Sequence, residues 1–109
     1  MGKFILKKDK AGKFRFNLKA SNGQIVLSSQ AYSTKSGALK GIDSVIRNSK
    51  HTARFIRKKA RDGSYYFVLK ASNGQIIGKS TFYSSRTGRE GGISIVKDSN
   101  DRQKAHNNV

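Results

Sequence analysis

The feature that most constrains this chain is an internal duplication. When residues 4–50 are laid over residues 55–101 without gaps, 21 of the 47 pairs are identical, and the heptapeptide KASNGQI occurs in both segments. Unbroken spacing predicts that the two halves fold alike. A period of 51 residues is long for a solenoid unit, and two copies are fewer than the three or so that a solenoid needs. We therefore expect the two halves to share one core.

The length of the chain suits one domain. It has 109 residues, of which 35% are hydrophobic, enough for a single modest core. We predict that residues 1–109 form one domain made of two repeats, about 1–50 and 51–101, with a short polar tail at 102–109.

Each repeat begins with patterns typical of antiparallel strands. In KFRFNLK, Phe14, Phe16 and Leu18 alternate with polar residues, so one face of this strand is apolar. The second copy, SYYFVLK, follows the same alternation. An SNG segment comes next in each repeat, and Asn-Gly is the pair that most readily takes the positive φ values of a type I′ turn. Gly12 and Gly63 mark an earlier hairpin loop. Each repeat is thus predicted to start as a three-stranded meander.

The hydrophobic period then changes to that of a helix. In residues 33–48, Ala38, Ile42 and Val45 recur at helical spacing, and the equivalent segment covers about residues 84–98. Because only one face of each strand is apolar, we predict an α+β fold with one antiparallel sheet and two helices packed on one face.

A glycine lies inside each predicted helix, at positions 41 and 92. Glycine costs a helix roughly 1 kcal/mol relative to alanine, so a repeated glycine indicates a repeated reason. We favour a close approach of helix backbone to sheet over a contact with a ligand.

The same residues resemble a known family. The motifs F-x-F-x-L-K-A-x-N-G-Q, Y-S and G-I-x-S-V are similar to those of the YegP-like family, small bacterial proteins of uncharacterised function. They lie at residues 14–24, 32–33 and 41–45, and again at 65–75, 83–84 and 92–96. Tyr65 replaces the first Phe and Ile95 replaces the Ser in the second repeat. The resemblance covers nearly the whole chain.

What the resemblance implies is a fold, without a mechanism. It implies a tandem repeat of three strands, a helix and a further short strand, with the halves joined in one sheet and the last strands exchanged between them. Some relatives have a single repeat and form dimers.

Charge is the strongest compositional signal. The chain has 23 Lys and Arg against 6 Asp and Glu, a formal net charge of +17. The two repeats carry +9 and +6, and the tail carries +2, so the folded body holds the positive charge. A polyanion such as nucleic acid or an anionic lipid surface is therefore the first functional hypothesis, and a merely solvated surface is the alternative.

Residues for catalysis or metal binding are few and scattered. The chain has no cysteine, and His51 and His106 have no metal-ligand partner at a useful spacing. The run GREGG at residues 88–92 invites comparison with a phosphate loop, but it lacks GxGxxG and a terminal GKS or GKT, and it aligns with the helical GALKG of the first repeat. We expect no enzyme activity, no cofactor and no metal.

Candidate nucleic-acid-binding residues come from two places. The basic clusters KKDK and IRKKAR occupy equivalent positions, which we assign to the first hairpin loop of each repeat. Outward strand faces add cations and one aromatic residue on which a base can stack. The candidates are Lys7, Lys8, Arg15, Lys19, Arg57, Lys58, Lys59, Arg61, Tyr66 and Lys70. Because an RNA-recognition sheet presents two or three aromatic residues, a single one favours binding of low specificity led by phosphate contacts.

The alternative is a protein interaction module, in which the sheet edge or the outward Tyr66 and Val68 patch docks an acidic partner or another copy of the chain. A membrane-surface role ranks third, because no basic amphipathic helix with large apolar residues is present. The start MGKFILKK lacks the apolar run of a signal peptide, and no stretch approaches the roughly 20 apolar residues that span a bilayer. We expect a cytoplasmic monomer, with a homodimer as the alternative.

Overall fold

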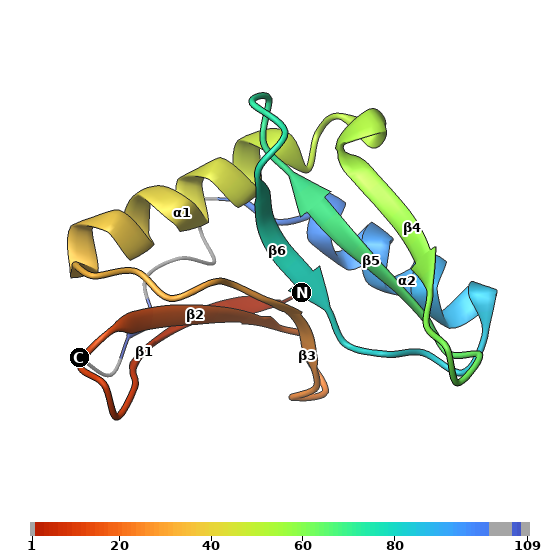
Figure 1. Cartoon of the computed structure of the whole chain (residues 1–109), viewed down its shortest axis with the longest axis horizontal. Helices are drawn as coiled ribbons and strands as arrows, with labels where there is room; N and C mark the ends of the chain where they lie inside the picture. The colour runs from red at the N-terminus through yellow and green to blue at the C-terminus, as the bar shows by residue number, and fades with distance from the viewer. Residues whose placement is uncertain (1, 101–105, 108–109) are drawn as a thin grey trace.

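A computed structural model of the chain describes residues 2–100 and the backbone of residues 106–107. It shows one α+β unit in which a twisted sheet is covered by two helices (Figure 1). The elements in chain order are β1 (Lys3–Lys8), β2 (Phe14–Lys19), β3 (Ile25–Ser28), α1 (Lys35–Asn48), the 3₁₀ helix η1 (Thr52–Arg54), β4 (Phe55–Lys59), β5 (Tyr65–Lys70), β6 (Ile76–Ser80), α2 (Arg86–Lys97) and β7 (His106–Asn107).

The sheet joins the two repeats through their third strands. Its order is β4-β5-β6-β3-β2-β1-β7, and all neighbours are antiparallel except β1 and β7, which are parallel. Ser28 of β3 lies opposite Lys79 of β6. These positions are equivalent in the two repeats, being 51 residues apart, so an approximate two-fold axis passes between them.

The core lies between the helices and one face of the sheet. Phe16, Leu18, Phe67 and Leu69 from the second strands are at most 1% exposed. A register shift in β3 and another in β6 each insert one extra residue into the strand. A β-bulge of this kind lets consecutive side chains point to the same side. Val26 and Ile77, the extra residues, therefore join the core.

Each helix packs across the boundary between the repeats. Helix α1 contacts β2 of its own repeat and β5 and β6 of the other, while α2 contacts β5 and β3. Thr34 and Ser85 cap the two helices by accepting a hydrogen bond from the backbone N–H three residues on. The Nζ of Lys50, just after α1, donates to the carbonyl of Lys97 at the end of α2, 2.6 Å away. The two repeats therefore share one core.

The glycine inside each helix lies where the helix backbone approaches the sheet closely. This agrees with the prediction made from the cost of a glycine at the same position in both helices. A Cβ at Gly41 would overlap the hydroxyl of Tyr32, and a Cβ at Gly92 would overlap that of Tyr83. The Tyr32 ring in turn stacks on Phe16, with ring centroids 6.2 Å apart. Glycine lets the helix backbone sit directly over these rings.

The hairpin turns differ in type from the prediction. The glycines at positions 12, 23, 63 and 74 have φ between +80° and +90°, and none of the other described residues has a positive φ. Asn22 therefore does not take the conformation that a type I′ turn requires. Ser21 lengthens the loop to three residues, and such a loop takes a type I turn followed by a left-handed glycine, here Gly23. Asn22 still belongs to the turn, because its Oδ1 accepts a hydrogen bond of 3.0 Å from the N–H of Gln24.

The ends of the two repeats are not alike. Helix α1 is followed by η1, where the resemblance implies a short strand. The backbone of β7 instead pairs with β1, so the last strand of the second repeat joins the first repeat. The rest of the predicted polar tail at 102–109 lies outside the described residues.

Candidate nucleic-acid interface

The sheet face opposite the helices, called the outer face below, is basic. The strands β1 to β6 contain no Asp or Glu. Strand alternation and register place seven cationic side chains on the outer face: Lys3, Lys7, Arg15, Lys19, Lys58, Lys70 and Lys79. Residues in one row cross six strands in the order Ile5, Asn17, Ser28, Lys79, Val68 and Ile56. The outer face therefore runs without a break across both repeats.

Like charges face each other directly on this surface. In the pairing of β1 with β2, Lys3 lies opposite Lys19 and Lys7 lies opposite Arg15. Cross-strand pairs of like charge destabilise a sheet. One acid lies at the border, because Asp9 Oδ2 accepts a hydrogen bond of 3.2 Å from Arg15 Nε. The backbone N–H of Lys13, then Arg15 and the N–H of Ala11, hold the pKa of Asp9 below its usual value.

The predicted site residues divide between the two sides of the sheet. The outer face carries Lys7, Arg15, Lys19, Lys58, Tyr66 and Lys70, while Lys8, Arg57 and Lys59 lie on the helix side and Arg61 lies in a hairpin loop. The Nζ of Lys8 is 5.6 Å from the ring centre of Phe14, and that of Lys59 is 5.4 Å from the ring centre of Tyr65. The ten candidates therefore do not form one surface.

The assignment of the two basic clusters to hairpin loops holds only for their last residues, such as Arg61. Lys7 and Lys8 belong to β1, and residues 57–59 belong to β4. The last lysine of each strand pairs with an aromatic residue, Lys8 with Phe14 and Lys59 with Tyr65.

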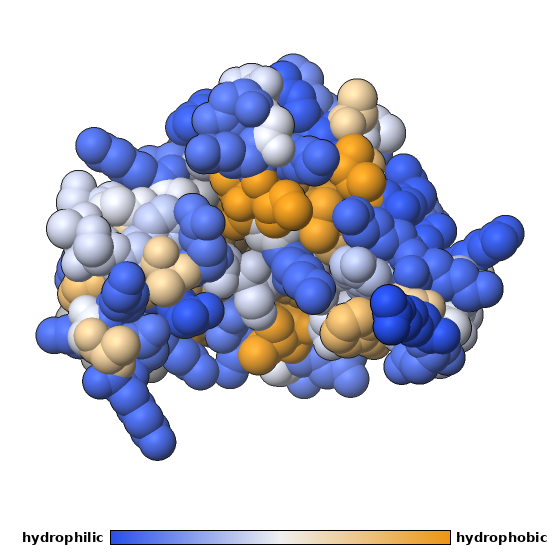
Figure 2. Space-filling model, viewed as in Figure 1, coloured by the Kyte–Doolittle hydropathy of each residue, from blue (hydrophilic) through white to orange (hydrophobic). Residues whose placement is uncertain are grey.

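The outer face of the second repeat also holds an aromatic cluster, defined here as Tyr66, Lys79 and Phe82. The two ring centroids are 5.2 Å apart with the planes at 60°, and Lys79 Nζ is 5.2 Å and 5.4 Å from them. Phe82 is 54% exposed and the nearby Ile76 is 47% exposed. Figure 2 shows hydrophobic patches over the region of β4 to β6 within a mostly hydrophilic surface.

Sequence reasoning missed Lys3, Lys79 and Phe82. One signal was available for Phe82: it is an aromatic residue in the polar segment before Tyr83, where the first repeat has Ala31. No such signal marked Lys79, because the bulge in β6 changes which side chains face outward.

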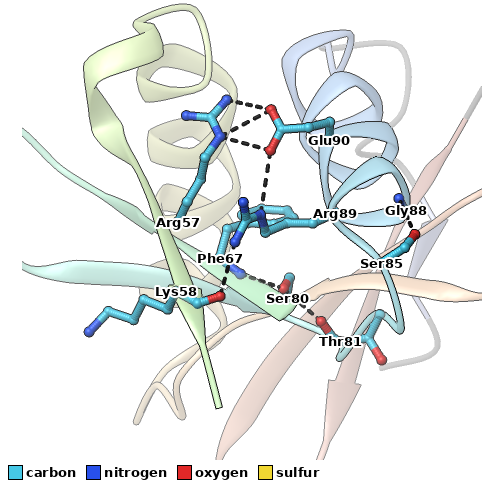
Figure 3. A network of polar contacts seen from close by, with 9 residues as sticks. All are labelled: Arg57, Lys58, Phe67, Ser80, Thr81, Ser85, Gly88, Arg89 and Glu90. Atoms are coloured by element: carbon cyan, nitrogen blue, oxygen red, sulfur yellow. Dashed lines mark hydrogen bonds and ion pairs between the residues drawn. The ribbon is translucent and has the colours of Figure 1, made fainter. Parts of the chain in front are cut away.

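Arg57 is held by an acidic partner within the protein. Its Nε and Nη2 donate to Glu90 of α2 at 2.8 Å and 2.7 Å, as Figure 3 shows. These hydrogen bonds raise the pKa of Arg57 and lower the pKa of Glu90. Arg89 also contacts Glu90 at 3.4 Å and donates to the carbonyl of Lys58 at 3.1 Å. The side chain of Arg57 therefore links β4 to α2.

The surface hollows are shallow. One of about 540 Å³ lies between Gly23 to Ile25 of the first repeat and Thr81 to Ser84 of the second, next to Phe82. Another of about 310 Å³ is lined by Lys3, Ile5 and Lys19 together with the turn after β2. In residues 2–100, no three His, Asp or Glu side chains gather as a metal site would need. Among the helices that the structure describes, none has the length and hydropathy of a membrane span.

The run GREGG lies within α2 and forms no phosphate loop.

Comparison with known proteins identifies the family. A family model described as a domain of unknown function, DUF1508, matches the chain twice, at residues 9–55 and 60–104. A UPF0339 protein of Pseudomonas aeruginosa is 50% identical over 95 residues, which are 87% of this chain and 86% of that protein. The UPF0339 protein YegP of Escherichia coli is 45% identical over 108 residues, 99% of this chain and 98% of that protein.

Two solved structures share the fold. The solution NMR structure of YegP from Escherichia coli, described as a protein of unknown function, has a TM-score of 0.89 at 45% identity, covering 98% of this chain and 92% of that one. The solution NMR structure of a UPF0339 protein from Shewanella oneidensis has a TM-score of 0.86 at 42% identity, covering 97% and 88%. The predicted YegP-like resemblance is confirmed, and the chain belongs to the DUF1508 family.

Proposed function

We propose that this protein is a non-enzymatic, cytoplasmic binding protein that holds nucleic acid with little sequence preference on its outer face. The observation that carries the proposal is the continuous outer face, where cations from both repeats gather and the strands provide no acid. Each phosphate that such a surface neutralises releases condensed counterions, and this release drives binding without regard to sequence.

The like-charge pairs support a role for this charge beyond solubility. Lys3 opposite Lys19 and Lys7 opposite Arg15 weaken the sheet, and exposed lysines placed elsewhere would give the same solubility. Natural proteins accept such local conflicts at functional sites. A bound phosphate backbone between the paired cations would remove the repulsion.

The test is a salt titration with a matched control. Affinity for a labelled nucleic acid is measured between about 0.05 M and 0.2 M salt. The outer-face variant replaces Lys7, Lys58 and Lys70 by Gln, and the control replaces Lys8, Lys40 and Lys59 by Gln. Both lose the same charge, and two of the control positions are direct neighbours of the test positions. The slope of log affinity against log salt should fall by about two to three units in the outer-face variant.

The control should change the slope much less, because Lys8 and Lys59 lie on the helix side of the sheet and Lys40 belongs to α1. Equal losses in both variants would mean that net charge alone, and not the outer face, binds the polyanion. If the parent protein binds no nucleic acid even at low salt, the proposal is wrong.

A second candidate is a protein interaction module, favoured by one observation. β1 is covered by β7, whereas β4 at the other side of the sheet has a free edge among the described residues. An acidic extended peptide or a second copy could add a strand there. The lysines of β4 weigh against this, because lysine on an edge strand is a common protection against pairing. We expect a monomer. Sedimentation at about 0.15 M salt, where the Debye length is about 8 Å, would reveal self-association.

A further inference from the structure

The two repeats differ at several neighbouring positions of the outer face. The buried residues of the second strands are the same in both repeats, for example Phe16 and Phe67 or Leu18 and Leu69. Four positions on or beside the outer face change in chemical class. Arg15, Asn17, Ser28 and Ala31 of the first repeat correspond to Tyr66, Val68, Lys79 and Phe82 of the second. One backbone therefore presents a polar, cationic surface in one half and an aromatic cluster in the other.

The aromatic cluster is built from three elements that meet only in the folded chain. Tyr66 comes from β5, Lys79 from β6 and Phe82 from the segment that follows. Val68, which shares this face, is only 3% exposed, so the surface beneath the cluster is packed. Phe82 nevertheless keeps 54% of its area in water, beside the hollow lined by Gly23 to Ile25. A flat ligand can reach this ring without moving the backbone.

We propose that the aromatic cluster is a stacking site for an unpaired base, so that the protein prefers single-stranded to double-stranded nucleic acid. This inference rests on the proposed function. Aromatic rings stack on any base, because every base has a π face, and a base within a duplex is already stacked and cannot reach them. Lys79 among the rings and Lys58 directly opposite Tyr66 are placed to hold the adjoining phosphates. The bound nucleic-acid strand would then continue from the aromatic cluster across the cationic half of the outer face.

The test compares three polyanions: an oligo(dT) strand of about 12 nucleotides, a duplex of the same length, and heparin, which has no bases. The variant replaces Tyr66 by Arg and Phe82 by Ala, the residues that the first repeat holds at the equivalent positions. Both residues already fit this backbone, and the net charge does not fall. Ile76→Ala, an exposed apolar residue outside the cluster, is the control.

We expect the variant to bind oligo(dT) roughly 5- to 150-fold more weakly than the parent, which is the range for loss of one stacked base. Affinity for the duplex and for heparin should stay the same or rise, because an arginine has been added. Ile76→Ala should match the parent. Since the chain has no tryptophan, binding of oligo(dT) can also be followed by quenching of tyrosine fluorescence, which should weaken when Tyr66 is replaced.

A reciprocal variant distinguishes a loss of stacking from a folding defect, because it is expected to gain binding. Arg15→Tyr with Ala31→Phe puts the aromatic pair into the first repeat, and it should increase the preference for oligo(dT) over the duplex.

The outcomes separate the two proposals. A parent that binds the duplex as tightly as oligo(dT), or a cluster variant that loses all three polyanions in parallel, would overturn the stacking site and leave the outer face as a phosphate-binding surface. A parent that binds none of the three at low salt would overturn both.

Discussion

Gly91 and Gly92 are neighbours in α2, yet a side chain at each would meet different surroundings. A Cβ at Gly92 would overlap the hydroxyl of Tyr83 and lie 2.8 Å from its Cζ, whereas a Cβ at Gly91 would have nothing within 4 Å. We predict that Gly91→Ala stabilises the protein by up to about 1 kcal/mol through helix propensity. Gly92→Ala should destabilise it by about 1–3 kcal/mol through overpacking. Urea unfolding of both variants measures the difference.

The hydroxyl of Tyr83 provides the control. Tyr83→Phe removes the nearest atom, so it should recover part of the loss in the Gly92→Ala background. Equal stabilities of the two alanine variants would show that α2 does not lie against Tyr83 as described.

Two phenylalanines of the second repeat should respond in opposite ways to truncation. Phe67 is fully buried and packs edge to face on Phe55, with centroids 5.7 Å apart, whereas Phe82 is 54% exposed. Phe67→Ala is expected to lower the free energy of unfolding by about 3–5 kcal/mol, as for other buried aromatic residues. Phe82→Ala should stay within about 0.5 kcal/mol of the parent. A parent-like melting temperature for Phe67→Ala would contradict the core described above.

At the scale of elements, β4 and α2 are joined by the ion pair of Arg57 and Glu90. The first repeat has Leu6 and Leu39 at these positions, so the second repeat has replaced apolar residues by charge. The side chains are 38% and 45% exposed, so screening keeps the contribution of the pair to stability below about 1 kcal/mol. The bidentate geometry favours the upper part of that range.

This pair predicts a pH dependence. The pKa of Glu90 is lowered in the folded state from its usual 4.5, chiefly by the hydrogen bonds from Arg57. A lowered pKa means that the stabilisation is present above the unfolded pKa and is lost as pH falls through the folded value. Glu90→Gln should therefore be less stable than the parent at neutral pH and equal to it in acid. A difference that persists in acid would mean that the glutamate acts by packing and not by charge.

Most elements were predictable because their signals are local. Alternation within residues 14–18 and helical spacing within residues 33–48 each depend on one stretch of chain. The turn type was missed because Ser21 adds one residue to the loop, which changes the turn that closes it. Each basic cluster spans the end of a strand and the loop after it. Residues 7–8 and 57–59 pair with the second strands, whereas Arg61 lies in the loop.

At the scale of the whole molecule, the outer face was predictable only in part. Arg15, Lys19, Tyr66 and Lys70 follow from alternation in the second strands, which carry the clearest pattern. The aromatic cluster does not, because it depends on how β6 lies beside β5. The bulge at Ile77 shifts the alternation of β6, so that Lys79 faces outward beside Tyr66.

The junction of the repeats is where two equivalent positions had to diverge. Leu27 of β3 and Gly78 of β6 are equivalent, and they meet beside the approximate two-fold axis: a Cβ at Gly78 would lie 2.7 Å from Leu27 Cδ2. Leu27 is fully buried, so it has little room to move. One leucine therefore fills a space that belongs to both repeats, and a second leucine would not fit.

This arrangement predicts strong coupling across the junction. Gly78→Leu alone should overpack the core, and Leu27→Gly alone should leave a cavity, so each should lower the free energy of unfolding by more than about 1 kcal/mol. The double variant moves the same leucine to the other side of the axis and should recover much of the loss. A double-mutant cycle in urea measures the coupling, for which about 0.5–3 kcal/mol is typical of residues in contact. Additive losses would mean that each repeat packs its own core, and that the junction is only a pair of hydrogen-bonded strands.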